Sequence, residues 1–299
     1  MSSAQDLNDS EHPGRKAFSG QAPRPPVFAN KLEEREFLKF RLAQALRIFG
    51  NRGYDEGVAG HITVRVSLFF SSKFNHNSYS KDPIRSDCFW VNPFGLHFKL
   101  IQPSDLLLVD HSGQILEESG QKDGPFRILN TAAFMIHSAI HAARPDVLCA
   151  AHSHSTYGKA FSALGRTLDP ISQDACAFYE EHALYTQYNG IVLDEVEGLA
   201  IAEALGSKKA AILQNHGLLV ATSSIEATVH YYISLERACQ VQLLADTAAA
   251  AHGGKTVPIN PAQAAVTGKL VGSQGGGWFS GSMEFMVLER EEGVKFQTA

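Results

Sequence analysis

Short apolar runs of strand length alternate with segments of helical periodicity along most of this chain. A first helix is predicted from Lys31, because in KLEEREFLKFRLAQALRIFGNRG apolar residues recur every three or four positions until Gly50 and Asn51. Three strand-like runs follow it, HITVRVSLFF, FWVNPFG and DLLLVDHSGQIL, the last with a turn from Asp110 to Gly113. The first half of the chain is therefore expected to be rich in β-structure.

The second half continues the alternation with longer helices. NTAAFMIHSAIHAARPDV is predicted as a helix capped by Asn130 or Thr131, with Pro145 beyond its end. We then expect a strand VLCAAHSHS, a helix TYGKAFSALG, a strand near HALYTQ, a helix GLAIAEALG, one strand over AAILQNHGLLVAT and a long helix from SIEATVHYY onward. Helices that flank a β core in this order favour one α/β or α+β domain of about 220 residues.

Composition divides the chain into three predicted parts. Residues 1–28 are rich in Pro, Gly, Ser and charge, which predicts a disordered N-terminal tail. Residues 29–252 are predicted to form the folded domain, and residues 253–299 a C-terminal extension whose GSQGGGWFSGSMEF is too rich in glycine to assign. The polar segment SSKFNHNSYSKDPIRSD is predicted to be a surface loop.

Charge and apolar content exclude several classes of protein. The net charge is −5 and the isoelectric point is about 6.2, with scattered basic residues, so no nucleic-acid partner is expected. No apolar run approaches the roughly 20 residues of a membrane span. The N-terminal residues lack the apolar stretch that a secretory signal peptide contains. We therefore expect a soluble cytoplasmic protein without a membrane partner, whose four cysteines are buried reduced thiols: Cys88, Cys149, Cys176 and Cys239.

Two histidines lie one residue apart at the end of the predicted strand VLCAAHSHS. Residues two apart in a strand face the same side, so His152 and His154 project together, as two ligands of one metal would. A third histidine, His216, interrupts another apolar strand between Asn215 and Gly217. Three neutral imidazoles bind a divalent metal and leave coordination positions open, as catalytic sites require. The alternative for His152 and His154 is two unrelated histidines on one strand face, and the alternative for His216 is a histidine in a hairpin turn.

Five motifs resemble the class II aldolase/adducin family, and its adducin-like branch in particular: GHITVR, VNPFGL, HSAIHAARPDV, AHSHS and QNHGLL. The resemblance runs from about Leu32 to Asp246. It implies a three-layer α/β/α domain around a central β-sheet and a cyclic tetramer with active sites between subunits. It also implies a divalent metal on His152, His154 and His216, with Zn²⁺ as the first candidate and Fe²⁺ or Mn²⁺ as alternatives.

The chain departs from the family at two places that matter for chemistry. Aldolases of the family carry Ser-Ser-Glu four residues before a helix histidine equivalent to His137, whereas this chain has Ala133 in place of that acid/base glutamate. Their phosphate-binding motifs are replaced by GHIT at residues 60–63 and by Phe94-Gly95. Phe94 offers a phosphate neither charge nor a side-chain hydrogen bond, so a non-phosphorylated substrate is expected.

Other residues must then move protons and bind the substrate. Glu181 and Asp174, in DPISQDACAFYEEHALY, are the candidate catalytic carboxylates, although acidic residues on a loop are usually only solvated. His61 and Arg65 are the candidate substrate-binding residues, with a surface arginine on a strand as the alternative for Arg65.

The resemblance and the retained histidines favour a metal-dependent lyase. Such an enzyme would perform aldol-type cleavage or decarboxylation of a non-phosphorylated hydroxy- or keto-acid through a metal-stabilised enolate. One alternative is a non-haem iron oxygenase of the same fold, because three imidazoles also suit Fe(II). Another is a non-catalytic, adducin-like scaffold protein.

Overall fold

The computed structural model describes residues 23–65, 88–188, 190 and 195–296. Its core is a seven-stranded sheet in the order β3-β2-β1-β4-β7-β6-β5, in which only β5 and β6 run parallel. The strands are β1 (His61–Arg65), β2 (Phe89–Val91), β3 (Leu107–Val109), β4 (Cys149–Ser153), β5 (His182–Tyr185), β6 (Ala210–Leu213) and β7 (Gly217–Thr222). Neighbouring strands such as β4 and β7 are far apart in sequence, so the sheet depends on long-range strand pairing.

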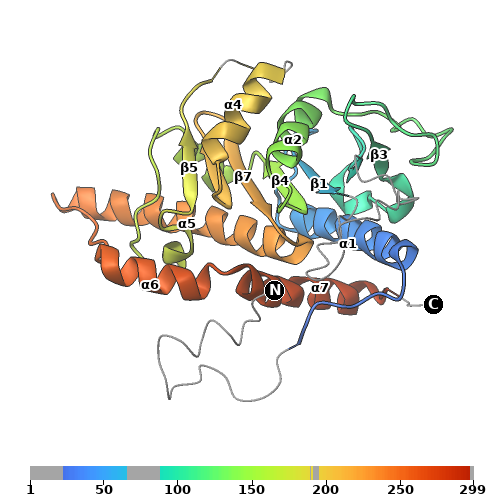
Figure 1. Cartoon of the computed structure of the whole chain (residues 1–299). Helices are drawn as coiled ribbons and strands as arrows, with labels where there is room; N and C mark the ends of the chain where they lie inside the picture. The colour runs from blue at the N-terminus through green and yellow to red at the C-terminus, as the bar shows by residue number, and fades with distance from the viewer. Residues whose placement is uncertain (1–22, 66–87, 189, 191–194, 297–299) are drawn as a thin grey trace, which may run out of the picture.

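Helices cover both faces of this sheet (Figure 1). One face packs on α2 (Thr131–Ala143) and α4 (Glu195–Leu205), and the other on α1 (Lys31–Asn51) and α5 (Ile225–Ala251). Successive residues of one strand point to opposite faces. Ala150 of β4 packs in the apolar cluster beneath α2 and α4, and Ala151 packs in the cluster beneath α1 and α5. The fold is therefore the predicted α/β/α arrangement around a central sheet.

Shorter elements connect these layers. They are α3 (Thr156–Ser162) and the 3₁₀ turns η1 (Phe98–Leu100), η2 (Pro103–Asp105) and η3 (Asp174–Phe178). The predicted cap of α2 is confirmed, because the Asn130 side chain accepts a hydrogen bond from the Ala133 N–H. The predicted turn after β3 also forms: the Asp110 carboxylate accepts from the Ser112 and Gln114 N–H groups, and Gly113 adopts φ 85°.

The single strand predicted over AAILQNHGLLVAT is wrong. The segment is an antiparallel hairpin of β6 and β7, with Leu213 paired to Gly217 across a turn at residues 214–216. Asn215 permits this turn, since it takes φ 58°, a left-handed conformation that asparagine tolerates better than most residues. His216 thus lies in a hairpin turn.

The glycine-rich segment after residue 272 folds as α7 (Gln274–Glu292) and follows α6 (Pro261–Val271). Two glycines allow α7 to lie directly against α5. A Cβ on Gly281 would stand 2.0 Å from the Glu226 carbonyl oxygen, and one on Gly277 would stand 2.4 Å from the Tyr231 ring. Close helix packing therefore compensates for the low helix propensity of glycine.

Three further predictions concern the cysteines, membrane spans and the predicted loop and tail. All four cysteines are free and buried, as expected. Among the described residues, no helix is both long and apolar enough to cross a membrane. The predicted loop SSKFNHNSYSKDPIRSD and most of the predicted N-terminal tail lie outside the described residues.

Candidate metal centre

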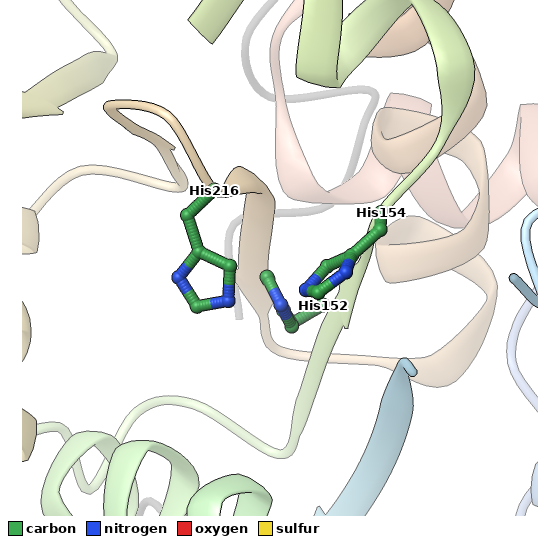
Figure 2. A group of neighbouring side chains, drawn as sticks. All are labelled: His152, His154 and His216. Atoms are coloured by element: carbon green, nitrogen blue, oxygen red, sulfur yellow. The ribbon is translucent and has the colours of Figure 1, made fainter. Parts of the chain in front are cut away.

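The three predicted metal-binding histidines come from two adjacent strands at one end of the sheet. His152 lies in β4, His154 follows the end of that strand, and His216 lies in the turn between β6 and β7. Because β4 pairs antiparallel with β7, the end of β4 meets the turn that begins β7. Figure 2 shows the three side chains gathered at this point.

The ligand atoms of these imidazoles are close enough for one ion. One nitrogen from each ring lies within 4.8 Å of the other two. The ring centroids of His152 and His216 are 4.6 Å apart, and those of His154 and His216 are 4.9 Å apart. Two nitrogens that bind one metal at about 2.0–2.1 Å lie at most about 4.2 Å apart, so a small adjustment of the side chains suffices for the set to bind one ion.

The protonation states of the rings also suit metal binding. Burial, followed by the neighbouring histidines, holds the pKa of His152 well below its usual value. Burial likewise lowers the pKa of His154 and brings that of His216 to about 4. Near neutral pH the rings are therefore uncharged, as ligation requires. The His152 Nδ1 lies 2.9 Å from the Leu218 carbonyl oxygen, a contact that fixes the N–H on Nδ1 and leaves Nε2 free for a metal.

A glycine beside the cluster permits this close approach of strands. A Cβ on Gly217 would lie 2.6 Å from the Ser153 carbonyl oxygen and 3.4 Å from the His152 ring. Any side chain at this position would push the hairpin turn away from β4. The glycine that follows His216 thus sets the distance between His216 and the other two histidines.

A second group of polar side chains lies behind the metal-binding set, between β1 and α2. His61 stands opposite His152 in the β1–β4 register, with ring centroids 5.1 Å apart, and its ring lies 4.1 Å from that of His137. Thr63 Oγ1 joins His137 Nδ1 at 2.7 Å and His141 Nε2 at 2.8 Å. Both ring nitrogens of His61 are buried without a hydrogen-bond partner in the described part of the chain.

One ion pair flanks the outer side of the cluster. The Lys159 ammonium of α3 pairs with the Glu56 carboxylate, which follows α1, and both charges influence the pKa of His154. The hydrogen bond from Lys159 lowers the pKa of Glu56, so this carboxylate is ionised near neutral pH. Sequence analysis did not single out Glu56, because a glutamate in a DEG turn is indistinguishable from an ordinary solvated one.

The structure does not bring the two candidate catalytic carboxylates to the histidines within one chain. β5 runs parallel to β6, with His182 opposite Ala210 and Tyr185 opposite Leu213. Glu181 precedes β5 and thus lies at the end of the sheet opposite His216, with its carboxylate 3.9 Å from the Lys209 ammonium. Asp174 begins η3, which packs against α6.

Within one chain, Arg65 lies away from the three histidines. It lies at the far end of β1 from His61, and its guanidinium donates a hydrogen bond to the His141 carbonyl oxygen at the end of α2. Within one chain Arg65 therefore stabilises α2 rather than facing the three histidines. His61, the other candidate substrate-binding residue, does lie beside the cluster.

Comparisons with known proteins agree with this geometry. Residues 40–243 match the sequence profile of the class II aldolase and adducin N-terminal domain. The chain belongs to the class II aldolase/adducin family. Family membership agrees with the sheet and the flanking helices described above.

Two curated relatives and one solved structure are especially similar to this family member. The chain is 41% identical to the 4-hydroxy-3-prenylphenylpyruvate oxygenase/4-hydroxy-3-prenylbenzoate synthase of Streptomyces roseochromogenus subsp. oscitans, over 86% of this chain and 83% of the relative. It is 42% identical to decarboxylase NovR of Streptomyces niveus, over 86% and 85%. The structure of L-fuculose 1-phosphate aldolase from Glaciozyma antarctica PI12 has a TM-score of 0.78 and 46% identity, covering 92% of this chain and 97% of that one.

Proposed function

We propose that this protein is a metal-dependent lyase that cleaves or decarboxylates a non-phosphorylated hydroxy- or keto-acid. The observation that carries the proposal is the convergence of three uncharged imidazoles, one nitrogen of each within 4.8 Å of the others. Three ligands leave coordination positions for substrate oxygens, which separates a catalytic site from a closed structural one. A bound divalent ion would supply Lewis-acid stabilisation of negative charge on those oxygens.

For the metal we propose Zn²⁺ first, with Fe²⁺ and Mn²⁺ as alternatives. Imidazole nitrogen is a ligand that zinc and iron both accept, so the histidine set does not select between them. His152, whose ring is oriented by the Leu218 carbonyl, is the best fixed of the three ligands.

The expected substrate is an acid without a phosphate. The curated relatives are named for a phenylpyruvate derivative, which is a 2-keto acid, and for decarboxylation. The similar solved structure is named for a sugar phosphate, whereas this chain has Phe94 where the family resemblance implies a phosphate-binding motif. The Phe94 N–H is already bonded to the Ile128 carbonyl oxygen at 2.8 Å, so it is not free to bind a phosphate.

The surrounding side chains support distinct roles in binding an acid. Lys159, beside His154, offers a cation for the substrate carboxylate, and Glu56 holds that cation in place. His61 offers a ring nitrogen to an oxygen of the substrate, since its nitrogens have no partner among the described residues and its ring adjoins His152. These assignments replace Glu181 and Asp174, which lie away from the histidines in the single chain.

An iron-dependent oxygenase is the second candidate, favoured by the name of the prenylphenylpyruvate relative. The two candidates differ in one simple property, since only the oxygenase consumes O₂ with turnover. A scaffold without catalysis, as in the adducin-like alternative, has no need for three converging imidazoles whose protonation suits metal binding.

We further propose a homotetramer located in the cytoplasm. The tetramer follows from the family resemblance, in which active sites lie between subunits. A neighbouring subunit would then supply a carboxylate for proton transfer, the role of the glutamate that Ala133 replaces.

A substrate panel tests the proposed function. Purified protein loaded with Zn²⁺, Fe²⁺ or Mn²⁺ is incubated with arylpyruvates, aliphatic 2-keto and 2-hydroxy acids and L-fuculose 1-phosphate, while CO₂, aldehyde and O₂ are measured. Turnover of an unphosphorylated acid without O₂ uptake supports the lyase. Turnover that needs O₂ supports the oxygenase, and turnover of the sugar phosphate alone contradicts the proposal.

A further inference from the structure

Helix α5 carries a buried carboxylate and a buried phenol that contact the chain on both sides of His154. Glu236 is 5% exposed and Tyr232 is fully buried, one turn of helix apart. Neither residue belongs to the metal-binding set or to the groups proposed to touch substrate. Both reach across from the layer of helices to the chain segment 153–158, in which His154 lies.

The Glu236 carboxylate accepts three hydrogen bonds from this segment. The Ser155 hydroxyl donates at 2.5 Å, the Tyr157 N–H at 2.8 Å and the Gly158 N–H at 2.7 Å. The two N–H groups belong to the first turn of α3, where backbone donors have no partner within the helix. Glu236 therefore fixes the start of α3, two residues after His154.

Tyr232 holds the other side of His154. Its hydroxyl lies 2.8 Å from Ser153 Oγ and 3.0 Å from the Ser153 carbonyl oxygen, to which it donates. It also lies 3.2 Å from Ser155 Oγ. The residues on both sides of His154 are thus tied to two side chains of α5.

We propose that Glu236 and Tyr232 are positioning residues, which set the placement of His154 relative to His152 and so the affinity and geometry of the metal site. This inference rests on the proposed metal-binding function. His154 lies between the end of β4 and the start of α3, so no strand or helix ladder fixes its backbone. Instead, the hydrogen bonds that join Ser153 and Ser155 to Tyr232 and Glu236 of α5 fix the backbone on both sides of His154.

Two residues of the same helix provide matched controls. Tyr231 is also fully buried, but its hydroxyl donates to the Ser273 carbonyl oxygen between α6 and α7, away from the histidines. Glu226 is as buried as Glu236 but faces Arg41 of α1, 3.4 Å away. Substitutions at these two positions test whether any loss of a buried hydrogen-bonding group on α5 has the same effect.

The experiment compares Glu236→Gln and Tyr232→Phe with Glu226→Gln and Tyr231→Phe in the full chain. Each protein is titrated with Co²⁺ alone, and both the affinity, by competition with a chelator, and the visible absorption bands of bound Co²⁺ are recorded. We expect Co²⁺ affinity to fall about 10- to 100-fold in Glu236→Gln, as for other residues that orient metal ligands. Tyr232→Phe should shift the bands, and the two controls should match the wild type.

The outcomes separate this inference from the proposed function. A wild-type protein that binds no Co²⁺ overturns both. A wild type that binds Co²⁺, with the same affinity and bands in Glu236→Gln and Tyr232→Phe, overturns the positioning role alone. Equal losses in the two control variants overturn it as well. If Glu236→Gln does not fold, as judged by circular dichroism, the milder Tyr232→Phe decides the question.

Discussion

The buried histidines between β1 and α2 predict that the metal-free protein loses stability in mild acid. Burial lowers the pKa of His141 to about 3 and holds the pKa values of His61 and His137 well below the usual one. In the unfolded chain these imidazoles titrate near pH 6.5. Below that pH the unfolded state binds more protons than the folded state, so the free energy of unfolding decreases as the pH falls.

The size of the effect follows from the number of imidazoles that stay neutral. One such group costs about 1.4 kcal/mol between pH 7.5 and pH 5.5, and four, including His152, would cost about 5 kcal/mol. Since carboxylates titrate mostly near pH 4, their contribution comes later in the acid range. A domain with an ordinary stability of about 5–15 kcal/mol would lose a large fraction of it over these two pH units.

Urea unfolding of the metal-free protein at pH 7.5, 6.5 and 5.5, followed by circular dichroism, measures this slope. The variant His141→Gln removes one titrating ring and should reduce the loss of stability between pH 7.5 and pH 5.5 by about 1.4 kcal/mol, which is about 0.7 kcal/mol per pH unit. A free energy of unfolding that stays constant from pH 7.5 to pH 5.5, or a slope unchanged in His141→Gln, would refute the reasoning.

Two stability predictions concern the C-terminal helices. Gly281→Ala should lower the free energy of unfolding by about 1–3 kcal/mol, because its Cβ would meet the Glu226 carbonyl oxygen 2.0 Å away. Gly254→Ala should not, because its Cβ would lie 3.7 Å from the Ala249 carbonyl oxygen, an ordinary contact distance. Lys209→Met should cost about 2–4 kcal/mol, since the buried ammonium donates to the carbonyls of Ala177 and Gly272. Equal urea midpoints for Gly281→Ala and Gly254→Ala, or a Lys209→Met midpoint equal to wild type, would contradict these expectations.

A further prediction concerns the lysine beside His154. If Lys159 binds the substrate carboxylate, Lys159→Met should raise KM for a 2-keto acid substrate with little change in bound metal, because the histidines are untouched. An unchanged KM would remove Lys159 from the binding site.

Local patterns in the sequence predicted most helices and the histidine set. The spacing of apolar residues and the Asn130 cap indicated α1 and α2. The H-x-H spacing placed His152 and His154 on one side of the chain because a strand has a period of two. α7 could not be predicted, since its glycines disfavour a helix until α5 is present to pack against them.

Positions that depend on strand order were beyond the reach of local patterns. Glu181 looked suitable because it follows the histidine pair in sequence, but the parallel pairing of β5 with β6 puts it at the opposite end of the sheet from His216. His61 is beside His152 only because β1 pairs with β4 in one particular register. No local pattern in the sequence indicated a role for Glu236, because its hydrogen-bond partner Ser155 is 81 residues away.

The most direct test of the central claim is metal analysis of the protein purified without chelator. The account predicts about one divalent transition metal per chain in the wild type, lost in the double variant His152→Ala, His154→Ala and in His216→Ala. The control His97→Ala, an exposed histidine paired with Asp55, should retain the metal. No metal in the wild type, even after reconstitution with Zn²⁺, Fe²⁺ or Mn²⁺, or equal metal in all four proteins, would contradict it.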